Sequence, residues 1–284
     1  MTDRRLSDTR GPRDEQSGRQ DSLVLGVIPA RFASTRLPGK VLLDIGGRTM
    51  LEHVWRRAQL ARCLDRVLIA TDDERIAATA ASFGADVTMT SPTHTCGTDR
   101  VAEAASGVSS DIVVNIQGDE PLLDPAWIDQ LVPALRHDTD AAMATIACPL
   151  HDPEQAADPN VVKVVSDAHS HALYFSRHPI PHDRHHTGIT RYRHIGLYAY
   201  RTAFLTEFTR LPPSPLEQAE GLEQLRALHY GHNIHVTTVT AGNDDGYSVD
   251  TPDDLQHVRH LFTDRSGPAS GFRANSEVPL SWSM

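Results

Sequence analysis

Short apolar runs alternate with helical patterns along the first half of the chain, and this alternation constrains the fold most strongly. Between the runs, residues 50–58 place apolar side chains on one helical face, and the alanine-rich segment 74–82 predicts a second helix. The strand-like runs are residues 23–28, 66–71, 111–117 and 141–147. This alternation favours a parallel sheet wrapped by helices, a doubly wound α/β fold. Such sheets bind ligands at the carboxyl ends of their strands.

The pattern changes after residue 161. Two strand-like runs flank a turn at 167–170, and a further strand is expected at 193–201. These features predict an antiparallel insertion at about 161–201, which could carry a second substrate and a dimer contact. A long loop rich in His and Arg at 178–194 is a candidate for a mobile lid. The remaining expected elements are a helix at 216–230, a strand at 234–240 and a helix at 252–262.

The charge and the composition limit what the chain can bind. Its 284 residues include 27 Lys and Arg against 37 Asp and Glu, a net charge of −10, which argues against a broad nucleic-acid-binding surface. No run approaches the roughly 18 apolar residues of a membrane span, so we expect no membrane segment. Three widely spaced cysteines predict reduced thiols in a cytoplasmic protein. The polar segments 1–22 and 264–284 predict a disordered and a flexible tail around one domain at 23–263.

The first expected strand leads directly into a cationic loop, VIPARFASTRLPGK, at residues 27–40. Arg31, Arg36 and Lys40 occur there with Ser34, two prolines and a glycine. The loop contains neither a Walker motif nor a dinucleotide-binding glycine motif. A backbone restrained by Pro and Gly, with side chains that donate to phosphate oxygens, predicts a different polyanion-binding loop. The alternative is a surface loop with incidental charge.

The second motif, NIQGDEPLL at residues 115–123, ends an expected strand in the adjacent carboxylates Asp119 and Glu120. Acidic side chains can face a phosphate-binding loop when a divalent cation lies between the carboxylates and the loop. Mg²⁺ prefers one or two carboxylates plus substrate oxygens, so Asp119 is a candidate ligand. The alternative is a solvated corner before the next helix, although Asp124 and Pro125 already suffice to begin that helix.

The third motif, GYSVDTPDDLQHV at residues 246–258, combines a helix start with one further acid. Thr251, Pro252 and Asp254 form a predicted capping box. Asp250 precedes the helix and is not explained by capping, so it is the candidate for a second metal ligand.

A similar capping argument applies before the helix at 216–230. Ser214 and Glu217 form a predicted capping box around Pro215, which makes Glu217 structural. Glu223 and Gln224, expected in the middle of the helix, are free to face a polar ligand.

Two further segments carry weaker signals. The turn HTCGTDR at 94–100 ends in Arg100 and could bind a base or a ribose. The segment HPIPHDRHH at 178–186 is rich in His, but prolines interrupt it and no acid or thiolate completes a zinc-binding spacing. We expect a lid or a solvated loop there rather than a metal site.

In this order the motifs resemble the CMP-Kdo synthetase family, the cytidylyltransferases that activate 3-deoxy-D-manno-octulosonate (Kdo). Residues 29–40 match every fixed position of the family's opening P-A-R-x-x-S-T-R-L-P-G-K. NIQGDEPL, NVVKVV, ALYFSR, RHIGLYAYR, SPLEQ…LEQLR and VDTPDDL match as well, so the resemblance extends over about 23–263. It implies a nucleotide-diphospho-sugar transferase fold, a Rossmann-like mixed α/β sheet flanked by helices, in a homodimer.

The resemblance also implies roles for individual residues. Arg31 and Lys40 would bind the triphosphate and Asp119 and Asp250 would bind Mg²⁺, and these four form the implied catalytic set. The implied CTP-binding residues are Pro29, Ala30, Arg31, Ser34, Lys40, Cys96, Gly97, Thr98 and Arg100. The implied contacts of the sugar acid are Arg36, Gln117, His194, Tyr198, Glu223 and Gln224. Ser176 and Arg177 also fall in the family's active-site region.

The implied reaction is attack by the anomeric hydroxyl of Kdo on the α-phosphate of CTP, which gives CMP-Kdo and pyrophosphate. Mg²⁺ and the cationic loop would stabilise the charge of the transition state, and no protein base stands out. The sequence departs from the family at Cys96, where serine is usual, and at His182, where Trp is common. The loop before Arg193 is also shorter by several residues.

Two alternatives remain open. The altered loop at 178–192 borders the sugar site, so the acceptor could be another small acid, such as a related keto-acid sugar or a phosphonate in a secondary pathway. The other alternative is a non-catalytic protein that senses CTP. An acceptor screen tests the first, and loss of turnover in Asp119→Asn would reject the second.

Overall fold

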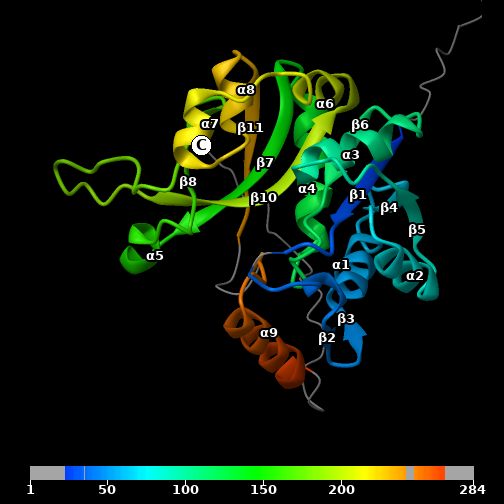
Figure 1. The fold of residues 1–284 in the computed structure, drawn as a ribbon. Helices are drawn as coiled ribbons and strands as arrows, with labels where there is room; N and C mark the ends of the chain where they lie inside the picture. The colour runs from blue at the N-terminus through cyan, green and yellow to red at the C-terminus, as the bar shows by residue number, and fades with distance from the viewer. Residues whose placement is uncertain (1–22, 35, 241–245, 266–284) are drawn as a thin grey trace, which may run out of the picture.

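The main sheet is mixed and is built around its first strand. The computed structural model describes residues 23–34, 36–240 and 246–265, and the path through the sheet is β11-β7-β10-β6-β1-β4-β5 (Figure 1). β1 lies parallel to β4 and β6, whereas β10 lies antiparallel between β6 and β7. The strands of this path are β1 (Val24–Ala30), β4 (Arg66–Thr71), β5 (Asp86–Met89), β6 (Ile112–Asn115), β7 (Ala141–Leu150), β10 (Arg191–Arg201) and β11 (Asn233–Thr238). The predicted α/β class with a mixed sheet is confirmed.

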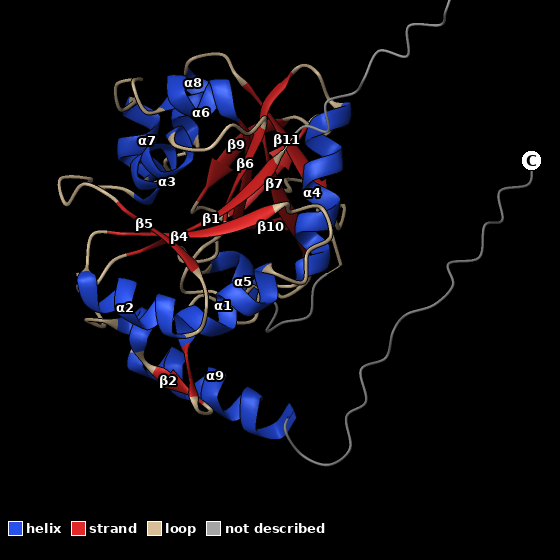
Figure 2. Cartoon of the chain, turned by 90° about the vertical axis from the view of Figure 1, so that its right-hand side faces the viewer, coloured by secondary structure: helices blue, strands red, loops and turns tan. Residues whose placement is uncertain are grey.

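Side chains that alternate along β1 account for the two layers of helices. Val24 and Ile28 pack on one face with α1, α2 and α4, whereas Leu25 and Val27 pack on the other face with α3, α6 and α8. All four side chains are fully buried, as expected for a strand covered on both faces. Figure 2 shows the helices on both sides of the strands. The helices are α1 (Met50–Ala58), α2 (Glu74–Ser82), α3 (Gly97–Ser106), α4 (Pro125–His137), α6 (Thr202–Phe208) and α8 (Leu225–His229).

The two strands expected around the turn at 167–170 are confirmed as β8 (Lys163–Ser166) and β9 (Ala172–Ser176), which pair antiparallel. β8 pairs with the beginning of β10. His171, the residue before β9, forms a single β-bridge with His235 of β11. β10, which we expected to lie in the same insertion, lies on the main path of the sheet between β6 and β7, and β8 and β9 extend the same nine-stranded sheet from it. The apolar side chains of β10 pack in the two cores on either face of that sheet.

A smaller apolar cluster fixes the last helix beneath the cationic loop. Val249, Leu255 and Val258 pack against Ile45 and Met50. The elements involved are η1 (Lys40–Leu42), β2 (Asp44–Ile45), β3 (Arg48–Thr49) and α9 (Pro252–Arg265), and α5 (Pro153–Ala157) lies apart from them after β7. In Figure 1, α9 lies below the sheet.

Several expected boundaries are wrong for identifiable reasons. The helix expected at 216–230 consists of α7 (Pro215–Glu220) and α8, because Gly221 adopts a φ of 63° and ends α7. Glu223 and Gln224 therefore lie between two helices rather than in the middle of one. α9 continues to Arg265, beyond the expected 262. The predicted tail 1–22 and residues 266–284 of the second tail lie outside the described residues.

Both predicted capping boxes are confirmed. The Ser214 hydroxyl accepts from the Glu217 N–H, and the Glu217 carboxylate accepts from the Ser214 N–H. At α9, Thr251 Oγ1 accepts from the Asp254 N–H, and Asp254 Oδ2 accepts from the Thr251 N–H.

Candidate active site

The cationic loop is folded back on itself at the carboxyl end of β1. The Gly39 N–H donates to the Phe32 carbonyl at 2.9 Å, which closes the loop. Gly39 has a φ of 68°, and a Cβ added there would lie 2.8 Å from the Phe32 ring, so the turn requires glycine. The Arg75 guanidinium stacks on the Phe32 ring, 3.4 Å from its centroid. The Phe32 ring therefore lies between Gly39 and the Arg75 guanidinium, and these contacts restrain the turn.

The acidic motif approaches the loop because Gly118 has no side chain. A Cβ on Gly118 would lie 2.9 Å from the Pro29 carbonyl oxygen, closer than backbone atoms allow. The next residue is joined to the segment before α9, since the Val249 N–H donates to the Asp119 carbonyl at 2.9 Å. Three segments that are far apart in the sequence therefore meet at the ends of β1 and β6.

Lys40 lies between the two candidate metal ligands. Its Nζ is 2.6 Å from Asp119 Oδ2 and 2.8 Å from Asp250 Oδ1, and it also donates to the Val249 carbonyl at 3.1 Å. Burial alone would lower the pKa of Lys40, but the charges and hydrogen bonds of Asp119 and Asp250 raise it overall. Arg36 Nη2 contacts the other oxygen of Asp250 at 2.9 Å.

A cavity of about 270 Å³ opens at this point. Its walls contain most of the residues that the resemblance assigns to CTP and to catalysis. They are Pro29, Ala30, Arg31, Ser34, Lys40, Cys96, Gly97, Arg100, Asp119 and Asp250, and the walls also contain Arg36 and Gln117, which the resemblance assigns to the sugar acid. We call this space the first cavity. Its density of fixed cations and N–H donors suits a triphosphate.

The residues expected on the cytidine side have structural partners of their own. Cys96 is the N-cap of α3, and its Sγ accepts from the Asp99 N–H at 3.4 Å. Burial and the nearby charge of Glu223 raise the pKa of the Cys96 thiol to about 12, so the thiol stays protonated. Arg100 is buried and donates to Asp72 and Thr90, with one nitrogen 3.0 Å from the Asp72 carboxylate. Thr98 does not line the first cavity.

A second cavity, of about 740 Å³, adjoins the first. Arg36 and Asp250 line both cavities. Three residues expected to contact the sugar acid, His194, Tyr198 and Gln224, lie in the walls of the second cavity. Those walls also contain Arg177 and Arg193, so together with Arg36 three arginines line a space of a size suitable for a small acid.

Two expected sugar contacts lie elsewhere. Gln117 lines the first cavity, and its side-chain amide donates to the Gly196 carbonyl at 3.1 Å. Glu223 lines neither cavity, and its carboxylate accepts from the Thr98 hydroxyl at 2.5 Å. Glu223 thereby joins the segment between α7 and α8 to the start of α3.

The remaining sugar-side residues have a strongly dehydrated environment. Burial lowers the pKa of His194 to about 3, so the imidazole is neutral, and it shares a 2.9 Å hydrogen bond with Thr145. Burial also raises the pKa of Tyr198 above its usual range. Gln224 is 5% exposed and its amide nitrogen makes no hydrogen bond within the protein. A buried donor in a cavity wall is available to a polar ligand.

Sequence reasoning missed several residues of the second cavity. Glu120 is 6% exposed and lines it, and burial together with the adjacent charge of Asp119 raises the pKa of Glu120 to about 8. Lys163 is fully buried and donates to the carbonyls of Asp158, Val161 and Arg177, which holds three wall residues together. A lysine in the middle of the apolar sequence run VVKVV, residues 161–165, was the available signal. His94, in a wall of the first cavity, was also missed.

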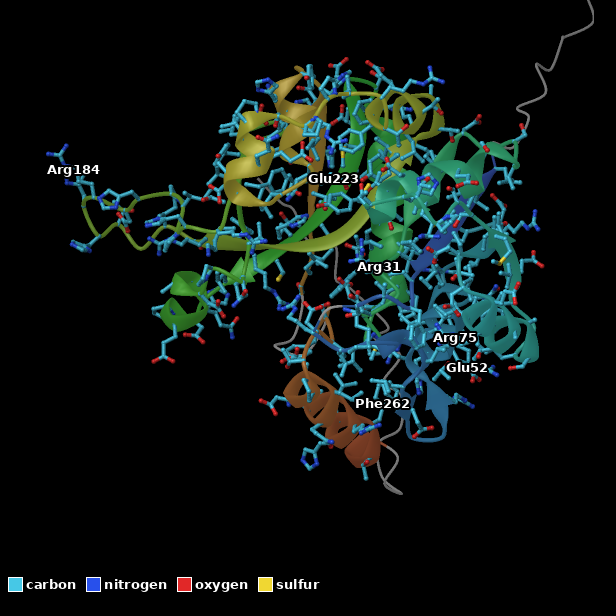
Figure 3. All side chains as sticks on the ribbon, in the orientation of Figure 1. Arg31, Glu52, Arg75, Arg184, Glu223 and Phe262 are labelled. Carbon is cyan, nitrogen blue, oxygen red and sulfur yellow. The ribbon has the colours of Figure 1, made fainter. Side chains whose placement is uncertain are left out.

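Of the remaining residues predicted from the sequence, Arg177 lines the second cavity, whereas Ser176 lines neither cavity. Ser176 Oγ donates to Glu220 Oε1 at 2.7 Å, and Arg177 donates to the Glu220 carbonyl, so both fix α7 against β9. The expected lid connects β9 to β10, and its residues 178–190 line neither cavity. Figure 3 shows Arg31 and Glu223 near the centre of the molecule, whereas Arg184 lies at the tip of the loop that projects to the left.

The donor set of the first cavity suits a hard divalent cation. The carboxylates of Asp119 and Asp250 both contact one cationic group, the Lys40 ammonium, so they already converge on a single position. Two carboxylates beside a phosphate-binding loop are the ligands that Mg²⁺ takes when substrate oxygens complete its shell. The residues present therefore fit the implied metal.

Comparison with known proteins agrees with this geometry. A family model described as cytidylyltransferase matches residues 25–234. The 3-deoxy-manno-octulosonate cytidylyltransferase of Solibacter usitatus is 53% identical over 240 residues, which cover 84% of this chain and 94% of the relative. The enzyme of the same name from Chromohalobacter salexigens is 52% identical over 258 residues, 87% of this chain and 99% of the relative. The chain belongs to the 3-deoxy-manno-octulosonate cytidylyltransferase family.

A solved structure of another family member has the same fold. It is a CMP:2-keto-3-deoxy-manno-octonic acid synthetase in complex with CTP, with a TM-score of 0.82 and 42% identity, and the match covers 86% of this chain and all of that chain. A cytidylyltransferase from Leptospira borgpetersenii is similar in fold alone, with a TM-score of 0.59 and 18% identity. Among the described residues, no helix has the length and apolar character to cross a membrane.

Proposed function

We propose that this chain transfers CMP from CTP to the anomeric hydroxyl of 3-deoxy-D-manno-octulosonate, with release of pyrophosphate. The observation that carries this proposal is the pair of adjoining cavities with Arg36 and Asp250 in the wall between them. A triphosphate in the first cavity and a small acid in the second would meet at this wall. The names of the relatives, which are 53% and 52% identical, supply the two substrates.

The chain's own residues would bind and orient the reactants. Arg31 and Lys40 would contact the phosphates, so that their charge stabilises pyrophosphate as the bond between the α and β phosphates breaks. Arg177 and Arg193 would bind the carboxylate of the sugar acid, and the Gln224 amide would donate to one of its hydroxyls. Protonated Tyr198 would donate a hydrogen bond without adding charge. Neutral His194, whose Nε2 donates to Thr145, would accept one through its other ring nitrogen.

Asp119 and Asp250 would hold Mg²⁺, which would lower the pKa of a coordinated hydroxyl and neutralise phosphate charge. The Lys40 ammonium now contacts both carboxylates, and its long side chain would allow it to move to the phosphates. We further propose that the product, an activated form of Kdo, supplies lipopolysaccharide synthesis. We also propose that the protein acts in the cytoplasm as a homodimer.

Release of pyrophosphate tests the proposal. Purified protein with CTP, Mg²⁺ and Kdo should release pyrophosphate, and omission of Kdo should abolish it. A related keto-acid sugar and a small phosphonate should give much slower release. Faster release with either of those acceptors would replace Kdo by that acceptor class, which the departures at Cys96, at His182 and in the shortened loop make worth testing.

Substitution in the first cavity tests the proposed metal ligands. Asp119→Asn and Asp250→Asn should each lower kcat/KM by at least about 100-fold, because each removes half of the charge that would hold the cation. Asp253→Asn is the matched control, since Asp253 is exposed in the first turn of α9 and lines neither cavity. Full turnover in Asp119→Asn would contradict the assignment.

A further inference from the structure

A second group of ligand-type side chains lies at the other end of the sheet. Asp138 follows α4, His171 precedes β9 and His235 lies in β11. One carboxylate oxygen and one nitrogen from each imidazole lie within 4.8 Å of one another. β7 starts just after Asp138, and because β10 is antiparallel to both β6 and β7, this start lies opposite the carboxyl ends that form the first cavity (Figure 1).

The carboxylate of Asp138 is oriented independently of the two imidazoles. Its Oδ1 accepts from the N–H groups of Asp140 and Ala141, both at 3.2 Å. Its Oδ2 is therefore directed toward His171 Nε2 and His235 Nδ1, each at 2.8 Å. Burial opposes ionisation of Asp138, but the hydrogen bonds from both imidazoles lower its pKa overall, so the carboxylate is charged.

The three side chains are largely buried but remain accessible from one side. Their exposed fractions lie between 16% and 19%. They line an open hollow of about 510 Å³, together with the exposed residues His137, Asp140 and His169. A cation can therefore enter, and water can complete its coordination.

The cluster also lies at a weakly paired seam. β9 and β11 are joined by the single bridge between His171 and His235 and by the Val236 N–H, which donates to the Ser170 carbonyl at 2.7 Å. A cation bound to residues of α4, β9 and β11 would cross-link three elements that otherwise share few backbone hydrogen bonds there.

We propose that Asp138, His171 and His235 bind a divalent transition metal of the Zn²⁺ class, at a site separate from the proposed catalytic metal. Two imidazole nitrogens and one carboxylate oxygen suit Zn²⁺ and its late first-row neighbours, whereas Mg²⁺ prefers oxygen ligands. Each imidazole would bind through the nitrogen that now donates to Asp138, and its proton would move to the other ring nitrogen. Water would occupy the fourth position.

The test uses the full chain, stripped of metal, in excess Mg²⁺ to saturate the acidic site. Titration with Co²⁺, followed by visible absorption, should show about one tightly bound equivalent per chain, which Zn²⁺ displaces. His171→Gln and His235→Gln should each weaken Zn²⁺ binding by more than about tenfold in calorimetry. The double variant His185→Gln/His186→Gln is the matched control, because it removes two exposed imidazoles from the loop before β10.

A readout of stability separates binding from misfolding. Zn²⁺ should raise the Tm of the wild type and of the loop control, but not that of His171→Gln or Asp138→Asn. CTP turnover in Mg²⁺ reports that each variant is folded, because none of these residues lines the first or second cavity. Unchanged Zn²⁺ affinity in a folded His171→Gln or Asp138→Asn, or loss of binding in the loop control alone, would overturn the proposal. Absence of binding to the wild type would do so as well and would show that the two imidazoles only hydrogen-bond to Asp138.

Discussion

Lys40 contacts two carboxylates rather than one, and this arrangement has a measurable consequence. Its ammonium lies where Asp119 and Asp250 converge, so in the free protein it would compete with the proposed metal for both carboxylates. Replacement by Met should remove this competition and leave two facing carboxylates with less neutralising charge. We expect Lys40→Met to bind Mn²⁺ at least about tenfold more tightly than the wild type when no nucleotide is present, because like charges favour a shared cation.

Electron paramagnetic resonance of free Mn²⁺ measures this affinity directly. CTP turnover should fall strongly in the same variant, because the proposed contact of the ammonium with the phosphates is lost. Arg48→Met is a suitable control, since Arg48 is half exposed and lines neither cavity. Weaker Mn²⁺ binding in Lys40→Met would mean that Lys40 orders the carboxylates rather than competing for them.

Glu120 should make the stability of the protein depend on pH. Its pKa is about 8 in the folded protein, against an ordinary value of 4.5, so the folded protein retains a proton that the unfolded chain loses. Stability should therefore fall as the pH rises from about 4.5 to about 8. Glu120→Gln removes this group. The difference in unfolding free energy between this variant and the wild type should therefore increase in favour of the variant across that window, to a few kcal/mol, and stay constant above it.

Urea denaturation at pH 5, 7 and 9 measures the effect. Glu103→Gln serves as the control, because Glu103 is exposed and its pKa is lowered rather than raised by the Ser91 N–H and His94. A constant difference between Glu120→Gln and the wild type at all three pH values would exclude a raised pKa.

At the scale of elements, the contact between the ends of β1 and β6 requires a residue without a side chain at position 118. A methyl group on Gly118 would approach the Pro29 carbonyl at 2.9 Å, and neither backbone can move without displacing a strand. We expect Gly118→Ala to destabilise the protein by about 1–3 kcal/mol and to lower turnover by at least about tenfold. Gly107→Ala is the matched control, because the nearest atom to its added Cβ is 4.0 Å away. Denaturation and pyrophosphate release measure the two effects, and normal turnover in Gly118→Ala would show that the strands can separate without harm.

The elements also show what the sequence could and could not predict. The strand at 66–71, the strand expected at 23–28 and found at 24–30, and the helix at 50–58 were recognisable because each one buries a regular apolar pattern. β5 and α6 were missed because β5 is a four-residue edge strand that is partly exposed and α6 has only seven residues. The break at Gly221 was visible as a glycine, but the helical pattern on either side of it outweighed this local signal.

Prediction of the site was limited in a different way. Capping explained Asp254 and Glu217 and left Asp250 unexplained, so local chemistry was enough to select a residue that lies beside Lys40. Glu120 and Lys163 could not be assigned in this way, because their importance comes from burial that only the folded chain creates. Spacing likewise could not show that Glu223 contacts Thr98, which is 125 residues away.

At the scale of the whole molecule, one face of the β8–β9 hairpin is suited to a second copy of the chain. Leu173 on β9 is 61% exposed, and within the described part of the chain β9 has a full ladder only with β8. If the proposed homodimer uses this face, Leu173→Glu should shift the protein from dimer to monomer in sedimentation velocity. Leu60→Glu should not, although Leu60 is 66% exposed, because it lies beyond α1 on another part of the surface. A dimer that persists in Leu173→Glu would place the contact elsewhere.

The shared wall between the two cavities has a kinetic consequence. Lys40 contacts one oxygen of Asp250 and Arg36 contacts the other. A ligand that moves Lys40 away would therefore change the electrostatic potential in the second cavity, which Asp250 and Arg36 also line. We therefore expect that nucleotide and acceptor do not bind independently. We expect the coupling through Asp250 to make the nucleotide bind before the acceptor.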